Sequence, residues 1–147
     1  MSVITHRRID LLLARYAESH RHPLNEAIHC ICVPAIVLSL LGLSWSATPL
    51  LAVVVVLASL VYYLTLSPAF AFGMLAMAGA MLLILSRLPA ASVLPASVAI
   101  FVAAWIGQFI GHKIEGKKPS FFEDLRFLLI GPLFVLSLLY RRWRIPY

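Results

Sequence analysis

The stretch AIHCICVPAIVLSLLGLSWSATPLLAVVVVLASLVYYLTLSPAFAFGMLAMAGAMLLILS, residues 27–86, contains no Asp, Glu, Lys or Arg. A membrane-spanning helix needs about 20 predominantly apolar residues, within a range of about 17–25. The stretch is long enough for three such helices, and a further apolar run follows Arg87. We therefore predict four transmembrane helices, over residues 27–43, 49–66, 68–86 and 88–110.

The composition of the whole chain agrees with this prediction. Hydrophobic residues make up 62% of the 147 residues and charged residues 12%, whereas soluble domains average about 25% charged residues. The net charge of +6 does not indicate a nucleic-acid partner, because the basic residues flank apolar runs instead of forming a face with aromatic or polar partners. We predict a multi-pass integral membrane protein in contact with membrane lipids, and no binding of nucleic acid.

Two segments flank the predicted spans. Residues 3–17 have the periodicity of an amphipathic helix, which suits the membrane surface, and Pro23 marks the end of this N-terminal part. Residues 127–140 are apolar but short, with Gly131-Pro132 in the middle, which indicates a re-entrant helix or a fifth helix. The predicted fold is an all-α helical bundle in one domain, residues 1–147, made of an N-terminal helix (1–22), a four-span core (23–112) and a basic loop, short helix and tail (113–147).

The basic residues predict the orientation of the bundle. Cytoplasmic loops of membrane proteins carry an excess of Lys and Arg. With four spans, all but one of the basic residues fall on one side, and only Arg87 lies elsewhere. We predict that this side is cytoplasmic, and we favour a bacterial inner membrane over the endoplasmic reticulum because the chain has no KDEL-type tail. The third span is rich in Ala and Gly, which suits packing within the chain or in a homo-oligomer.

This topology brings two polar clusters to the same depth in the membrane. His20 and His29 lie at the start of the first span, and His112 lies at the end of the fourth. Asn25 shares a helix face with His29, and Gln108 and Glu115 share one with His112, because residues three or four apart are neighbours on a helix. Gly107 and Gly111 would let another helix approach that face closely.

The residue types suit a metal ion, with alternatives left open. Imidazole binds both Fe(II) and Zn(II), and the spacing does not choose between them. A single His at the end of a span is more often a hydrogen-bonding residue than a ligand, and His22 fits that interpretation, as does His6. Glu115 could equally pair with a basic residue at the surface, namely Lys113, Lys118 or Arg126.

The two clusters together resemble a known family, the small membrane proteins similar to the fungal 2-hydroxy fatty acid dioxygenase of phytosphingosine breakdown. The first motif consists of His20, Asn25, His29, Val33 and Pro34. The second consists of Gln108, Gly111, His112, Glu115, Gly116 and Pro119, followed by Gly131 and Pro132. One departure is that LFVLSLLYRR, after Pro132, lacks the acidic residue that some relatives are expected to carry.

The resemblance implies an Fe(II)-dependent dioxygenase that uses O2 to shorten a 2-hydroxy fatty acid by one carbon, the α-oxidation step. His20, His29 and His112 would then hold the iron. Asn25 and Gln108 would orient ligands or substrate, and Glu115 would be a fourth ligand or a base. Two alternatives from other classes remain at this point, a zinc-dependent membrane lipid hydrolase and a non-enzymatic scaffold or transporter subunit. Transporters usually contain internal repeats, and this sequence has none.

Overall fold

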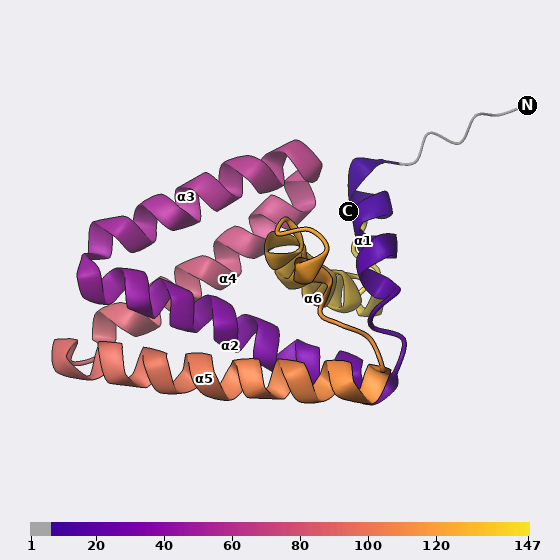
Figure 1. Ribbon diagram of the computed structural model, residues 1–147. Coiled ribbons are helices and arrows are strands. Elements are labelled where there is room, and N and C mark those ends of the chain that lie inside the picture. The colour runs from indigo at the N-terminus through magenta and orange to yellow at the C-terminus, as the bar shows by residue number, and fades with distance from the viewer. Residues whose placement is uncertain (1–6) are drawn as a thin grey trace, which may run out of the picture.

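The computed structural model describes residues 7–147, and all regular structure in this part of the chain is helical (Figure 1). The predicted all-α class is therefore confirmed. Residues 3–6 of the predicted N-terminal helix, and His6 with them, lie outside the described residues. The helices in chain order are α1 (Arg8–Ala17), α2 (Pro23–Ala47), α3 (Pro49–Leu66), α4 (Pro68–Arg87), α5 (Ala90–Glu115), a 3-10 turn η1 (Ser120–Phe122) and α6 (Phe127–Arg142).

Four of these helices, α2 to α5, are long and apolar enough to cross a membrane, as the sequence predicts. Proline stands at the start of α2, α3 and α4, where its missing N–H costs no hydrogen bond. α2 is longer than the predicted span 27–43 because its first turn includes polar residues that a hydropathy argument leaves out. α5 likewise continues past residue 110 and ends where Gly116 adopts a left-handed φ of 74°.

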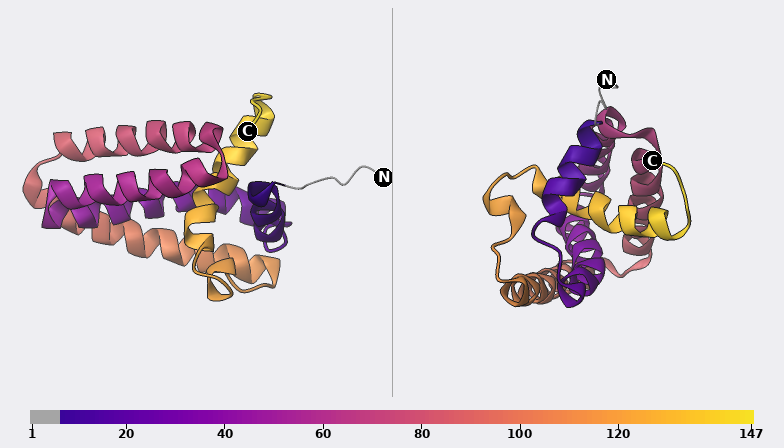
Figure 2. Two further views of the ribbon diagram at one scale, coloured as in Figure 1. Left: turned by 90° about the horizontal axis from the view of Figure 1, so that it is seen from above. Right: turned by 90° about the vertical axis from the view of Figure 1, so that its right-hand side faces the viewer.

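α2 and α5 form the closest pair of helices in the bundle and lie side by side (Figures 1 and 2). The two predicted glycines lie in their interface. A Cβ on Gly107 would lie 2.5 Å from Cys32 Sγ, and a Cβ on Gly111 would overlap Asn25 Oδ1. The glycines therefore allow a separation that larger residues would prevent, and the polar residues of the two helices come together.

α1 and α6 cover one end of the bundle, with α6 running across the direction of the spans (Figure 2). Tyr63 Oη at the end of α3 donates a hydrogen bond to the Leu129 carbonyl at 2.9 Å, and Tyr140 Oη donates one to the Ala69 carbonyl at 2.7 Å. Ile130 and Leu133 of α6 are fully buried. α6 is thus an integral part of the covered end, and its depth in the membrane stays a prediction.

The outer faces of α2 to α5 are apolar and exposed, with side chains such as Ile31, Leu50, Val61 and Ile106 more than half accessible. In water such a surface would be unfavourable, whereas lipid tails cover it without cost. This exposure supports placement of the bundle in a membrane.

Candidate metal centre

Three histidines meet beneath α1, where α2 begins and α5 ends. His20 comes from the loop between α1 and α2, His29 from the second turn of α2 and His112 from the last turn of α5. All three are buried, with 3%, 1% and 4% of their surface exposed. One ligand atom of each lies within 4.8 Å of the others, and the two Nε2 atoms of His29 and His112 are 3.1 Å apart. The structure thus brings together the three histidines that the sequence singled out.

Backbone carbonyls fix how two of these rings are turned. His20 Nδ1 lies 2.7 Å from the Tyr16 carbonyl oxygen, and His29 Nδ1 lies 2.9 Å from the Asn25 carbonyl oxygen. Because a carbonyl only accepts, both Nδ1 atoms carry the hydrogen, and each Nε2 atom therefore bears a lone pair. Metal-binding histidines commonly donate their second ring N–H in this way.

Burial also favours the form of His20 that binds a metal. The pKa of the His20 imidazole is lowered below its usual value by its removal from water, against opposing contributions from the Tyr16 carbonyl and the Glu115 carboxylate. The ring stacks on Tyr16, with 4.2 Å between centroids and 6° between planes. His20 is therefore held neutral and in a fixed plane, and only a neutral imidazole can act as a ligand.

Glu115 ties the loop that carries His20 to α5. Its carboxylate accepts hydrogen bonds from the backbone N–H groups of Arg21 at 3.0 Å and His22 at 2.8 Å, and from Asn25 Nδ2 at 3.1 Å. Asn25 Nδ2 also donates to the Ser19 carbonyl at 3.0 Å. These bonds hold the turn around His20 from two helices at once.

This arrangement differs from two alternatives that the sequence left open. The ion pairs found in residues 7–147 do not include Glu115, so the structure does not show the alternative of a pair with Lys113, Lys118 or Arg126. The carboxylate is also outside the group of side chains that could hold a metal in this part of the chain. His22 is exposed and accepts the Leu24 N–H at 3.2 Å, which makes it the N-cap of α2.

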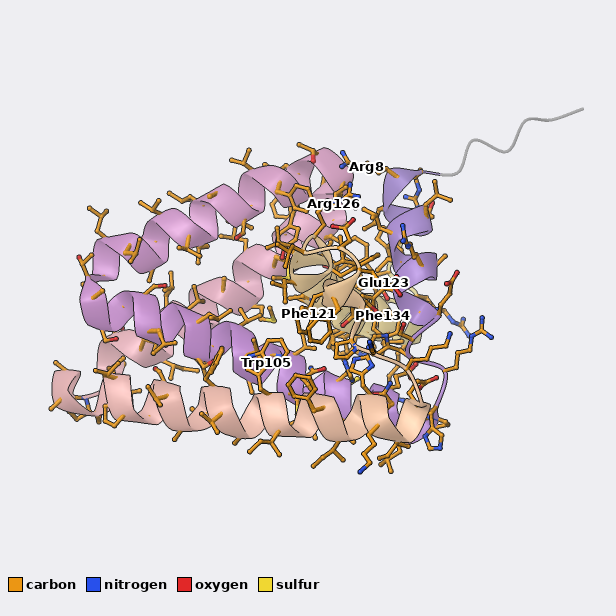
Figure 3. All side chains as sticks on the ribbon, in the orientation of Figure 1. Arg8, Trp105, Phe121, Glu123, Arg126 and Phe134 are labelled. Carbon is orange, nitrogen blue, oxygen red and sulfur yellow. The ribbon has the colours of Figure 1, made fainter. Side chains whose placement is uncertain are left out.

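An apolar cavity of about 280 Å³ opens beside the histidines, between α2, α5 and α6. His112 and Gln108 line one end of it, and Gln108 lies next to His29. Segment 116–126 covers it, and within that cover Phe121 packs edge-on against Trp105 of α5, with 5.1 Å between ring centroids (Figure 3). The group of histidines is therefore reached through an apolar space.

Besides His112 Nδ1, two polar side-chain atoms of the cavity lining have no hydrogen-bond partner within residues 7–147, namely Trp105 Nε1 and Ser120 Oγ. The sequence indicated packing for Trp105, and nothing in the pattern around Ser120 indicated a role. Both depend on segment 116–126 folding over α5, which no local spacing reveals. Buried polar groups without a partner are costly, so a ligand in the cavity that accepts a hydrogen bond would satisfy them.

The donor set fits a metal ion. His20 Nε2 is buried and has no hydrogen-bond partner among the described residues. The lone pair of His29 Nε2 accepts a hydrogen bond from His112 Nε2 at 3.1 Å, and a bound ion would replace that hydrogen. The distance is close to the separation of about 3 Å between adjacent nitrogens that each lie about 2.1 Å from one ion. Three neutral imidazoles leave further coordination positions open, as catalytic iron and zinc sites do.

A comparison with protein-family models gives a match over nearly the whole chain. The matching model is described as Mpo1-like, 2-hydroxy-palmitic acid dioxygenase Mpo1-like, and it covers residues 7–143. The chain belongs to the Mpo1-like family. The resemblance seen in the sequence is therefore confirmed, and the matched region includes the three histidines, Glu115 and the whole cavity lining. Comparisons with curated proteins and with solved structures gave no match.

Proposed function

We propose that the chain is an Fe(II)-dependent dioxygenase that shortens 2-hydroxy fatty acids by one carbon at the cytoplasmic face of a membrane. The observation that carries this proposal is the group of three buried imidazoles at the end of an apolar cavity. A metal-binding group next to water would suit many substrates, whereas one reached through an apolar space within a membrane bundle suits a lipid. The family description supports the same chemistry.

His20, His29 and His112 are the proposed ligands. Bound Fe(II) would supply the positions at which O2 and the hydroxy and carboxylate oxygens of the substrate meet. The protein's own contribution is to hold the three rings with their Nε2 atoms converging and to exclude water. Because the Nδ1 hydrogens of His20 and His29 are fixed by carbonyls, neither ring has to reorient when the site fills.

Glu115, Asn25 and Gln108 have supporting roles in this proposal. Glu115 accepts three hydrogen bonds, so we assign it to positioning the His20 loop in preference to direct ligation or proton abstraction. Asn25 connects Glu115 to Ser19 and keeps the same loop in place from α2. Gln108, beside His29 and in the cavity lining, is the residue of the three that can contact the substrate.

The basic residues around the site suit an acidic lipid. Arg21 follows His20, and Lys113, Lys117 and Lys118 lie at the end of α5. Lys117 Nζ donates to the Glu18 carbonyl at 2.9 Å, which keeps its charge next to the His20 loop. A basic rim of this kind raises the local concentration of a carboxylate, while the acyl chain enters the apolar cavity.

The reaction balances without an external reductant. One 2-hydroxy acid and one O2 give the acid one carbon shorter, one CO2 and one water. The substrate loses four electrons in breaking the bond between its first two carbons, and O2 takes up these four electrons. Product formation should therefore match O2 consumption one to one.

Anaerobic purification with metal quantification, followed by addition of 2-hydroxypalmitate and O2, tests the proposal. We expect about one iron per chain, and pentadecanoic acid, CO2 and O2 uptake in equal amounts. Bound zinc with hydrolysis of a lipid ester and no O2 uptake would instead identify a hydrolase. A protein that binds no metal under these conditions would be neither enzyme, and the scaffold interpretation would replace the proposal.

A further inference from the structure

A second apolar cavity, of about 150 Å³, lies between α2, α3, α4 and α6. Its lining includes Val56 of α3 and Ala78 of α4, which are both buried. It shares four lining residues with the cavity beside the histidines, namely Val37 and Leu40 of α2 and Leu128 and Pro132 of α6. These four side chains form the wall between the two cavities.

The first cavity has one polar end and one apolar end. His112 and Phe101 line it on the same helix and are eleven residues apart, or about 16 Å along the axis. The polar side chains of the lining are Tyr16, Gln108, His112, Trp105 and Ser120, which lie on α1, α5 or the covering segment. The wall formed by α2 is apolar, and so is the passage that leads to the second cavity.

We infer that the two cavities form one binding site for the acyl chain, with the second cavity holding its tail and setting the longest chain accepted. This inference rests on the proposed function, since it takes the substrate to be a fatty acid bound with its head at the histidines. The aliphatic side chains of Val37, Leu40 and Leu128 form most of the passage, and rotamer changes of the two leucines would widen it. Ala78 supplies the space in the second cavity that a larger side chain would fill.

The main test narrows the second cavity and leaves the histidines untouched. Ala78→Leu adds three carbon atoms to a buried position, and Ala80→Leu makes the same change on an exposed face of the same helix. The measured quantity is the ratio of kcat/KM for 2-hydroxystearate to kcat/KM for 2-hydroxyoctanoate, in which any loss of folded enzyme cancels. We expect Ala78→Leu to lower this ratio by about tenfold or more, and Ala80→Leu to leave it unchanged. An unchanged ratio in folded, metal-loaded Ala78→Leu protein would overturn the inference.

A second measurement uses the unaltered protein and does not need turnover. A 2-hydroxy fatty acid of sixteen carbons with a diazirine at its last carbon is irradiated with the protein, and the adducts are mapped by mass spectrometry. We expect adducts on α3 and α4, at residues of the second cavity, that excess 2-hydroxypalmitate removes. Adducts confined to membrane lipid, or to the outer face of α5, would mean that the tail leaves the bundle, and the inference would be wrong.

The two measurements separate this inference from the proposed function. Oxygen uptake with adducts outside the second cavity would retain the dioxygenase and reject the acyl site. Competed adducts in the second cavity with no oxygen uptake would retain the acyl site and reject the dioxygenase.

Discussion

The two ends of the bundle differ in how their buried polar groups are partnered. In the half away from α1, Ser39 Oγ donates to the Ile36 carbonyl at 2.8 Å, within its own helix turn. At the covered end, Glu115 accepts hydrogen bonds from residues 90 to 94 positions away. The first kind of bond satisfies a polar atom locally, whereas the second joins separate elements and fixes their relative position.

This contrast indicates that the covered end has lower stability because it carries polar groups for function. Burying polar groups costs free energy unless every donor and acceptor finds a partner. At the covered end, His20 Nε2, His112 Nδ1, Trp105 Nε1 and Ser120 Oγ have no partner within residues 7–147. All but one of the twelve Lys and Arg residues also lie on α1, on the adjoining ends of α2 and α5, or at either end of α6, and Arg87 is the exception. A polar, incompletely satisfied end on an apolar bundle is the pattern expected of a binding site.

Replacing a histidine of the centre should have the largest effect. His29→Ala or His112→Ala removes one of the three proposed ligands, so bound iron should fall to background in metal analysis of anaerobically purified protein. The loss of activity should exceed the about 10–100-fold that removal of an outer hydrogen-bond partner costs. His22→Ala is the matched control, because the exposed His22 side chain only caps α2 and the backbone N–H that binds Glu115 is kept in the variant. We expect it to keep its iron and to lose about 1 kcal/mol of stability.

Stoichiometric iron and normal turnover in both His29→Ala and His112→Ala would reject the metal centre. If His22→Ala loses iron to the same degree as the His29 and His112 variants, the metal centre would also be rejected.

The Glu115 network should show the next largest effect. Glu115→Gln replaces one acceptor oxygen by a donor, so either the Arg21 N–H at Oε1 or the His22 N–H and Asn25 Nδ2 at Oε2 lose their acceptor, which loosens the His20 loop. We expect iron affinity to fall about 10–100-fold. In cobalt-substituted protein, the visible spectrum should shift as the His20 nitrogen is lost, a change that a general loss of stability would not produce.

Glu123→Gln is the control for this variant, since Glu123 is exposed and contacts only Arg15, at 3.7 Å. Iron affinity and cobalt spectrum should both stay unchanged in it. If Glu115→Gln has the cobalt spectrum of the unaltered protein, the carboxylate does not position His20.

Much of the fold could be predicted because proline and charge mark its boundaries. The predicted helix 49–66 coincides with α3, since Pro49 and Pro68 stand at the starts of consecutive helices. The predicted span stops at residue 110 because the residues after it are polar, whereas the helix face shared by Gln108, His112 and Glu115 already implied that α5 continues, as the structure shows. Hydropathy identifies the part of a helix that lies in lipid, and capping residues identify where the helix ends.

The candidate site was only partly predictable. The positive-inside pattern brings His20, His29 and His112 to one end, and the structure has them there. The partners of Glu115 could not be predicted, because two of them are backbone N–H groups of a loop whose path depends on tertiary packing. Trp105 and Ser120 depend in the same way on how segment 116–126 lies over α5. Spacing rules describe one helix at a time, and these contacts are between elements.

Gly111→Ala tests whether close approach of α2 and α5 is what builds the covered end. A Cβ at this position overlaps Asn25 Oδ1, so the helices must separate or Asn25 must move, at a cost of about 1–3 kcal/mol. We expect a lower thermal unfolding midpoint in detergent, together with weaker iron binding. Gly79→Ala is the control, because nothing lies within 4 Å of its Cβ position, and alanine there should raise stability by up to about 1 kcal/mol. A Gly111→Ala protein as stable as the unaltered chain would show that the interface between α2 and α5 can accommodate a Cβ at this position.

The smallest effect is expected for Ser120→Ala, and it sharpens the comparison of the two ends. The buried Ser120 hydroxyl has no hydrogen-bond partner within the described residues, so its removal should leave the free energy of unfolding unchanged or raise it by about 1 kcal/mol at most. If it donates to an oxygen of the substrate, KM for the 2-hydroxy acid should rise about fivefold, which corresponds to about 1 kcal/mol. Ser39→Ala should do the reverse, lowering stability through the loss of its bond to Ile36 and leaving KM unchanged. An unaltered KM in Ser120→Ala would mean that this hydroxyl does not contact the substrate, and that Gln108 and Trp105 are the polar contacts to test next.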